Sequence, residues 1–235
     1  MKIIAVSTSP RKNGNGDSAV LAAAEGAKSL GAEVEVVYLR DLKMNYCTGC
    51  CLCKKEDADG CVQRDDVTEL LKKFHSADGI IFCAPIYMTQ LAGQAKVLFD
   101  RCYSLSKPNK NRQRPAGPPP MGERKPMEGK VEAAASAPAV VGPEMSKTAI
   151  VYSPSLMGVS PDQQPRKKML IITTSNSMRA EHDLNRAETM AVQFKGAGVT
   201  DYKLVTVPGC HPLDGGGKTE ENIEILKEVG RWLAE

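Results

Sequence analysis

The chain has 235 residues, and the 42% that are hydrophobic suffice for one well-buried α/β domain with extra material, or for two small domains. Its 31 lysines and arginines nearly balance 28 aspartates and glutamates, so net charge gives no general attraction to nucleic acid or to a membrane surface. The N-terminal apolar run is too short for a signal peptide, and no stretch of about 18 apolar residues follows, so we expect a cytoplasmic protein.

Strands and helices are predicted to alternate along the chain. The expected strands are 3–6, 32–39, 79–85, 169–174 and 202–207, and the expected helices are about 17–28, 66–74, 91–105, 180–196 and 219–233. We expect Asp17 or Ser18 to cap the first helix and Gly31 to end it. Continuously apolar strands joined by helices predict a parallel sheet with helices on both faces and with ligands at the carboxyl ends of the strands.

Residues 104–168 interrupt this order, because they are rich in proline, glycine and basic residues. We therefore expect a single domain over 1–235 that carries a long insertion at about 104–168. Within it, only "TAIVYSPSLMG", residues 148–158, is expected to add a strand or to pack as a lid. The basic part is read as a solvated linker, with docking of an acidic partner as the alternative.

The loop after the first strand, "STSPRKNGNGDS" at residues 7–18, is the first candidate site. It combines hydroxyl and amide side chains, glycines, Arg11 and a helix N-terminus, which together suit a single phosphate. It fits neither the Walker pattern nor the spaced-glycine dinucleotide fingerprint. We expect a phosphate cradle, and the alternative is an ordinary polar loop between a strand and a helix.

The loop after the third strand contains "APIYMTQLAGQ". Tyr87 offers a flat stacking surface, and backbone amides between Ile86 and Thr89 can bond the heteroatoms of a flavin ring. The alternative is a core tyrosine at a strand end. A third polar loop, "TTSNSM" after the fourth strand, brings Thr174, Ser175 or Asn176 to the same edge of the sheet.

Two of these segments, "SPRKNGN" and "APIYMTQLAGQAKVLFDR", resemble the NADPH-dependent FMN reductase group of flavodoxin-like proteins. The resemblance implies a flavodoxin-like five-stranded parallel sheet in the order 2-1-3-4-5, with FMN as cofactor. Lys96, Asp100 and Arg101 match a pattern typical of the helix that follows the second loop. The chain departs from the group by placing Gly16 and Asp17 before Ser18. The implied FMN-binding residues are Ser9, Arg11, Asn15, Ser18, Pro85, Ile86, Tyr87, Met88 and Thr89, and Thr174 and Ser175 complete the expected set.

Five of the eight cysteines lie in "CTGCCLCKKEDADGC", residues 47–61. In a reducing compartment, clustered cysteines are more often metal ligands or redox groups than disulfides. Cys47, Cys50 and Cys53 repeat every three residues, so their thiolates can surround one face of a 4Fe–4S cluster while Cys61 closes the fourth corner. Zinc or free thiols are the alternative, although zinc more often uses two CxxC pairs separated by a longer arm. Whether Cys61 or Cys51 completes the cluster stays open.

The C-x2-C-x2-C-x7-C spacing after the second strand resembles the iron–sulfur flavoprotein family of anaerobic archaea and bacteria. The resemblance implies that Cys47, Cys50, Cys53 and Cys61 hold a 4Fe–4S cluster and that the chain forms a homodimer or homotetramer. We therefore expect an FMN-dependent electron-transfer enzyme, which passes electrons between a one-electron donor such as ferredoxin and a small acceptor, namely oxygen, peroxide or a quinone. Because the flavin supplies the chemistry, no acid or base residue is needed.

Two other functions compete with this one. The first is an NAD(P)H-dependent FMN or quinone reductase without a cluster. The second is a flavodoxin-like binding module with a zinc site. Neither nucleic acid nor a membrane is an expected partner in any of the three.

Overall fold

A computed structural model describes residues 1–106, 149–152, 167–176, 183, 187–188, 190–191, 194–211 and 217–235. Residues 1–107 and 146–235 belong to one compact unit, and residues 108–145 form a second one that lies outside the described residues. Most of the expected insertion and most of the helix expected at 180–196 also lie outside them. A single domain with an insertion therefore stays a prediction.

The described residues form a seven-stranded sheet in the order β2-β1-β3-β6-β7-β5, and β4 pairs with β3. Its strands are β1 (Lys2–Ser7), β2 (Glu33–Tyr38), β3 (Gly79–Tyr87), β4 (Gln90–Leu91), β5 (Ile150–Tyr152), β6 (Lys167–Thr174) and β7 (Val199–Val207). β1, β2, β3, β6 and β7 are parallel, which confirms the five expected strands and their order. β4 and β5 are antiparallel additions to that sheet. β5 falls in the segment 148–158 that was expected to add a strand.

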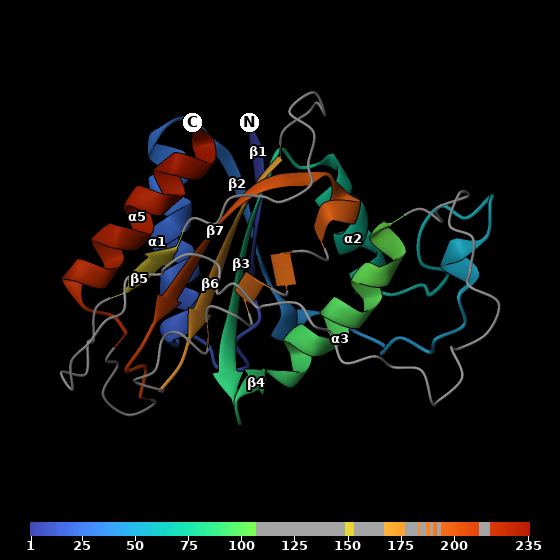
Figure 1. The fold of residues 1–235 in the computed structure, drawn as a ribbon, viewed down its shortest axis with the longest axis horizontal. Coiled ribbons are helices and arrows are strands. Elements are labelled where there is room, and N and C mark those ends of the chain that lie inside the picture. Colours follow the sequence, from blue (N-terminus) through green and yellow to red (C-terminus); the bar gives the residue numbers. More distant parts are fainter. Residues whose placement is uncertain are drawn as a thin grey trace, which may run out of the picture. The chain divides into compact units, whose positions relative to one another are not determined.

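Helices cover both faces of the sheet. α1 (Asn15–Ser29) and α5 (Glu220–Ala234) lie on one face, and α2 (Asp66–Ser76) and α3 (Gly93–Arg101) lie on the other (Figure 1). Each face buries its own apolar cluster, as expected for strands that are apolar on both sides. α1 and α5 pack closely because they meet at Gly26 and Gly230, where an added Cβ would overlap the backbone of the other helix.

The ends of the helices agree only in part with the sequence patterns. Gly31 lies in the left-handed region with a φ of +84°, as a helix stop requires. α1 begins after Gly14 without any side-chain cap, so the prediction that Asp17 or Ser18 caps it is wrong. α2 is capped by Asp65, whose carboxylate accepts a hydrogen bond from the Thr68 backbone N–H at 3.2 Å. No helix among the described residues is long and apolar enough to cross a membrane.

Short 3₁₀ turns join these elements. They are η1 (Leu39–Asp41), η2 (Leu52–Lys54), η3 (Cys102–Leu105) and η4 (Phe194–Ala197). The segment from η1 to α2 contains the cysteine loop, and it runs beside the C-terminal end of α3, away from the strands (Figure 1). The polar loops after β1, β3 and β6 instead lie together at the carboxyl edge of the sheet, because these strands are parallel neighbours.

Candidate functional site

The loop after β1 leads into the N-terminus of α1. The Thr8 backbone N–H donates to the Cys83 carbonyl of β3 at 3.0 Å, which fixes the start of the loop. Ser9 is buried, and its hydroxyl both donates to the Arg11 carbonyl at 3.2 Å and accepts from the Arg11 backbone N–H at 3.3 Å. Asn15 is also buried and Ser18 is half-buried, while Arg11 is exposed. The backbone of this loop is therefore held by its own side chains.

A buried ion pair stabilises the loop after β1. Asp17 accepts hydrogen bonds from the Ser7 hydroxyl at 2.6 Å and from the Asn13 backbone N–H at 2.8 Å. Arg40 of η1 pairs with Asp17 at 2.9 Å, and the two side chains are 11% and 4% exposed. The same Arg40 nitrogen donates to the Ser9 carbonyl at 3.2 Å. Asp17 thus organises the loop and does not cap the helix.

The loop and the helix start offer unfilled hydrogen-bond donors. Among the described residues no side chain caps α1, so its first backbone N–H groups can bind an anion, and its first internal bond runs from the Ser18 N–H to the Gly14 carbonyl at 3.1 Å. The Thr8 hydroxyl is buried and has no partner among the described residues. A buried hydroxyl without a partner is costly, so a ligand oxygen here would be favourable. The arrangement fits a phosphate group.

The end of β3 and β4 form a tight hairpin at the same edge. Tyr87 pairs with Gln90, and Met88 and Thr89 form the two-residue turn with φ values of +46° and +62°. Residues other than glycine rarely adopt this left-handed backbone conformation, so the turn is strained, as is common where a ligand binds. Met88 is 93% exposed and Tyr87 is 42% exposed. An exposed apolar tip of this kind suits a flat ring.

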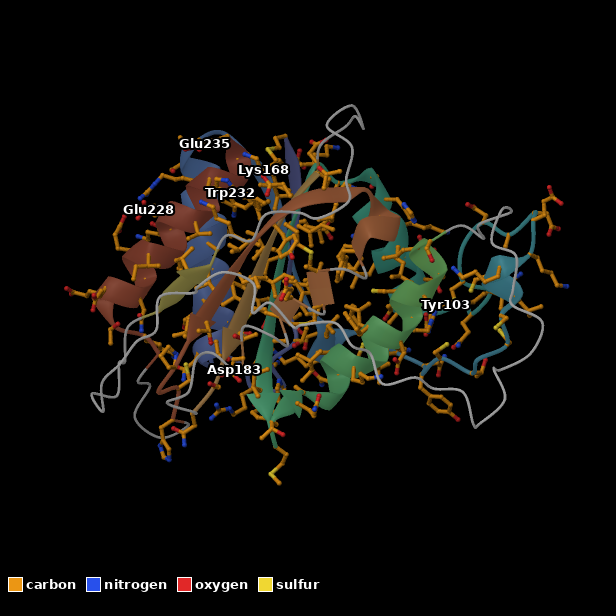
Figure 2. The ribbon with its side chains drawn as sticks, viewed as in Figure 1. Tyr103, Lys168, Asp183, Glu228, Trp232 and Glu235 are labelled. Atoms are coloured by element: carbon orange, nitrogen blue, oxygen red, sulfur yellow. The ribbon has the colours of Figure 1, made fainter. Side chains whose placement is uncertain are left out.

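The third loop lies next to the hairpin. Pro85 of β3 is in register with Thr174 of β6, so the second and third predicted loops are neighbours. Thr174 and Ser175 are both buried. The Ser175 hydroxyl donates to the Asp183 carboxylate at 2.5 Å, and Asp183 lies near the carboxyl end of the sheet in Figure 2. The hydroxyl of Ser175 is therefore engaged within the protein.

The five clustered cysteines line one pocket. Its wall is completed by the end of α3 and by η3, with Arg101 and Tyr103 among the lining residues. The loop folds back on itself through left-handed residues at Gly49, Cys51 and Gly60. No three His, Cys, Asp or Glu side chains among the described residues are arranged so that they could hold one metal ion. The lining cysteines are Cys47, Cys50, Cys51, Cys53 and Cys61.

The pKa values of two cysteines in this pocket are shifted in opposite directions. A hydrogen bond with the Leu52 backbone and another with the Thr48 side chain lower the pKa of Cys50, which favours its thiolate. Burial raises the pKa of Cys53. Lys54 lies against the pocket and donates to the Tyr103 carbonyl at 2.5 Å, with its ammonium 4.1 Å from the centre of the Tyr103 ring. A cation beside the pocket favours a bound group of net negative charge.

Three residues that shape these sites were not predicted as site residues. Arg40 follows β2 in a 3₁₀ turn, Lys54 lies within the cysteine loop, and Asp65 follows that loop. Asp65 lies in the acidic start of the helix expected at 66–74, which was the only sequence signal for it. The partners of Arg40 and Lys54 lie 23 to 52 residues away along the chain, so local patterns carry no trace of them.

Known proteins support the family suggested by these loops. Three relatives are iron–sulfur flavoproteins. The one of Methanosarcina thermophila is 41% identical over 109 residues, that of Archaeoglobus fulgidus 41% over 103, and that of Methanocaldococcus jannaschii 42% over 105. The matches cover 46%, 43% and 45% of this chain and 56%, 45% and 53% of the relatives, so the chain spans about half the length of these relatives.

Solved structures share the fold. An NAD(P)H:quinone oxidoreductase from Methanothermobacter marburgensis aligns with a TM-score of 0.62 and 15% identity, covering 100% of this chain and 98% of that one. An FMN-dependent NADH-azoreductase from Bacillus anthracis aligns with a TM-score of 0.56 and 14% identity, covering all of both chains. Residues 1–147, more than half of the chain, match the family described as NADPH-dependent FMN reductase. The chain therefore belongs to the NADPH-dependent FMN reductase family.

Proposed function

We propose that the protein is an FMN-dependent oxidoreductase whose cysteine pocket holds a 4Fe–4S cluster, so that one chain handles both single electrons and electron pairs. The observation that carries this proposal is the position of all five clustered cysteines around one pocket of a chain whose first loop has a geometry that fits a phosphate. FMN, when bound, accepts a hydride or single electrons, and a 4Fe–4S cluster passes one electron at a time.

The carboxyl edge of the sheet supports the FMN part of the proposal. The uncapped start of α1 and the unpartnered Thr8 hydroxyl would bind the FMN phosphate, with Ser9, Asn15 and Ser18 beside them. The hairpin with Tyr87 and Met88 at its tip would lie along the ring, and its backbone would bond ring heteroatoms. The buried Ser175 would hold the neighbouring loop through Asp183. The complete proposed set is Ser9, Arg11, Asn15, Ser18, Pro85, Ile86, Tyr87, Met88, Thr89, Thr174 and Ser175.

The cysteine pocket supports the cluster part of the proposal. Cys47, Cys50, Cys53 and Cys61 would be the ligands, and Cys51 would be a neighbour. An all-thiol donor set suits iron–sulfur clusters, in which each sulfur binds a different iron. Ligands of such a cluster lie farther apart than the ligands of a single ion, which agrees with the lack of a preformed single-ion site among the described residues. Clustered free thiols also support a reducing compartment, and we place the protein in the cytoplasm.

We propose that electrons pass between chains. α3 begins directly after the hairpin and ends at the cysteine pocket, and its nine residues span about 13 Å at 1.5 Å per residue. A homodimer or homotetramer that sets the cysteine pocket of one chain against the flavin edge of another would shorten this separation. The donor would be ferredoxin or a similar one-electron carrier, and the acceptor would be oxygen, peroxide or a quinone.

The family match favours one other function, a plain NAD(P)H-dependent FMN or quinone reductase. In that case a hydride would pass directly to the flavin ring at the hairpin, and the cysteines would have no part in turnover.

Replacement of single cysteines under anaerobic conditions tests the proposal. We expect Cys53→Ser and Cys61→Ser to lose most of their iron and acid-labile sulfide while keeping FMN, because the two sites lie on different parts of the chain. Cys51→Ser is the matched control, since it changes a thiol of the same loop and should keep iron, sulfide and FMN. A wild-type protein with FMN but no iron or labile sulfide would contradict the proposal and favour the plain reductase.

A further inference from the structure

Arg101 is the most deeply buried charged side chain near the cysteine pocket. Its side chain is 0% exposed, and that of Asp65, its ion-pair partner, is 3% exposed. The pair is bidentate, because one guanidinium nitrogen donates to Asp65 at 2.7 Å and the other at 2.9 Å. Asp65 caps α2 and Arg101 ends α3, so the pair joins these two helices.

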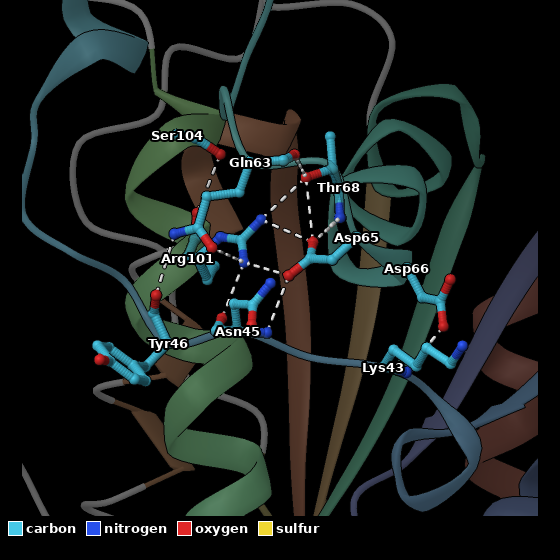
Figure 3. A network of polar contacts seen from close by, with 9 residues as sticks. All are labelled: Lys43, Asn45, Tyr46, Gln63, Asp65, Asp66, Thr68, Arg101 and Ser104. Carbon is cyan, nitrogen blue, oxygen red and sulfur yellow. Dashed lines mark hydrogen bonds and ion pairs between the residues drawn. The ribbon is translucent and has the colours of Figure 1, made fainter.

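The same guanidinium holds both ends of the cysteine loop. It donates to the Asn45 carbonyl at 2.8 Å, two residues before Cys47, and to the Gln63 side chain at 3.3 Å, two residues after Cys61. The Asn45 backbone N–H returns a bond to Asp65 at 2.9 Å. Figure 3 shows these groups gathered around the guanidinium. Residues 47–61 therefore form a loop whose two ends are tied to one side chain.

One donor of Arg101 is left over. Its Nε–H is buried and has no hydrogen-bond partner among the described residues. Arg101 and Cys61 both line the cysteine pocket. A buried donor without a partner is unfavourable, so an acceptor in this pocket would be favourable. The sulfur of a cysteine that binds a cluster is such an acceptor.

We propose that Arg101 is the positioning residue of the cysteine pocket: it closes the base of loop 47–61 and donates a hydrogen bond to the Cys61 sulfur when that sulfur binds the cluster. This inference rests on the proposed function. It also favours Cys61 over Cys51 as the fourth ligand, because the guanidinium binds Gln63, which is two residues after Cys61. Hydrogen bonds to cluster sulfurs raise the reduction potential, so Arg101 would also set the potential of the cluster.

Arg101→Lys tests this role, because lysine keeps the positive charge and loses the planar set of donors. We expect a variant that keeps FMN but releases iron to a chelator faster, within the range of about 10- to 100-fold typical for loss of a group that holds a metal ligand. The cluster that remains should have a more negative midpoint potential. Lys96→Gln is the matched control, because Lys96 pairs with Asp100 at 2.5 Å on the same helix but is exposed.

A second measurement does not depend on whether a variant of Arg101 folds. In wild-type protein grown with ¹⁵N-arginine, pulsed electron paramagnetic resonance of the reduced cluster should detect coupling to one guanidinium nitrogen. The coupling should persist in Arg64→Gln, which removes the other arginine of this segment. The role of Arg101 is contradicted if the wild type binds a full cluster and shows no such coupling. It is also contradicted if Arg101→Lys keeps the rate of iron release and the midpoint potential of the wild type. Either result leaves the proposed function standing. A wild type without iron overturns the proposed function as well.

Discussion

At the start of α1, Asp17 places a negative charge beside the expected phosphate site. A carboxylate in the first turn stabilises a helix, but it also repels an anion bound at the same N-terminus. Arg40 offsets this charge at 2.9 Å, and it also holds the loop carbonyl of Ser9. Because of this pair, the N-terminus of α1 can bind an anion even though its first turn contains an acidic residue.

This residue pair gives a prediction about flavin selectivity. Arg40→Gln leaves the buried Asp17 without its counter-charge, so we expect the affinity for FMN to fall roughly tenfold or more, which corresponds to at least about 1.4 kcal/mol. Riboflavin lacks the phosphate, and its affinity should change much less. Titrations of the apoprotein that follow the quenching of flavin fluorescence measure both affinities.

The double variant Asp17→Asn, Arg40→Gln is the control for charge, because it removes both members of the pair. It should recover part of the lost FMN affinity. If FMN and riboflavin lose affinity equally in Arg40→Gln, the pair supports the loop without acting on the phosphate.

At the scale of elements, α2 and α3 are joined by the buried pair of Asp65 and Arg101. Burial alone would raise the pKa of Asp65, but the hydrogen bonds and charge of Arg101, together with the backbone N–H groups of Asn45 and Thr68, lower it to about 2 from its usual 3.8. A carboxyl whose pKa is lower in the folded state stabilises that state above its unfolded pKa. This stabilisation is lost as the pH falls through the folded pKa.

The pair therefore predicts a specific acid sensitivity. Between about pH 4 and pH 2, the free energy of unfolding of the wild type should fall by about 2 kcal/mol through Asp65 alone. Asp65→Asn should be less stable than the wild type at neutral pH, and the difference should shrink over this range. Urea unfolding at several pH values measures both quantities.

Glu69→Gln on the same helix is the matched control, because the ion pair of Glu69 with Lys72 is exposed and contributes little. Its stability should run parallel to that of the wild type at every pH. A constant difference between wild type and Asp65→Asn down to pH 2 would contradict the assignment of the lowered pKa.

In the whole molecule, the parallel sheet with helices on both faces followed from the continuously apolar strands, whereas the strand order came from the resemblance to flavodoxin-like proteins. Residues 148–158 were expected to add a strand or to pack as a lid. They contribute the edge strand β5, whose antiparallel direction was not expected, since no local signal fixes the direction of an edge strand. The β3–β4 hairpin was missed because Met88 and Thr89 lack the asparagine and glycine that mark such turns.

The candidate sites were predictable only as loops. The hydroxyls, glycines and cysteines are local patterns, and the segments they pointed to lie at the carboxyl edge of the sheet and around one pocket. The supporting pairs, Asp17 with Arg40 and Asp65 with Arg101, join residues 23 and 36 positions apart. Such partners depend on how the helices pack, so Asp17 was read as a helix cap and Asp65 was not singled out at all.

A chain that carries both a flavin and a cluster accepts electrons at both groups, and an anaerobic reductive titration of the protein as purified counts them. We expect each chain to take up about three electrons, two into FMN and one into the cluster, with loss of the flavin and the iron–sulfur absorption bands in the same titration. Uptake of about two electrons per chain, with bleaching of the flavin bands alone, would contradict it.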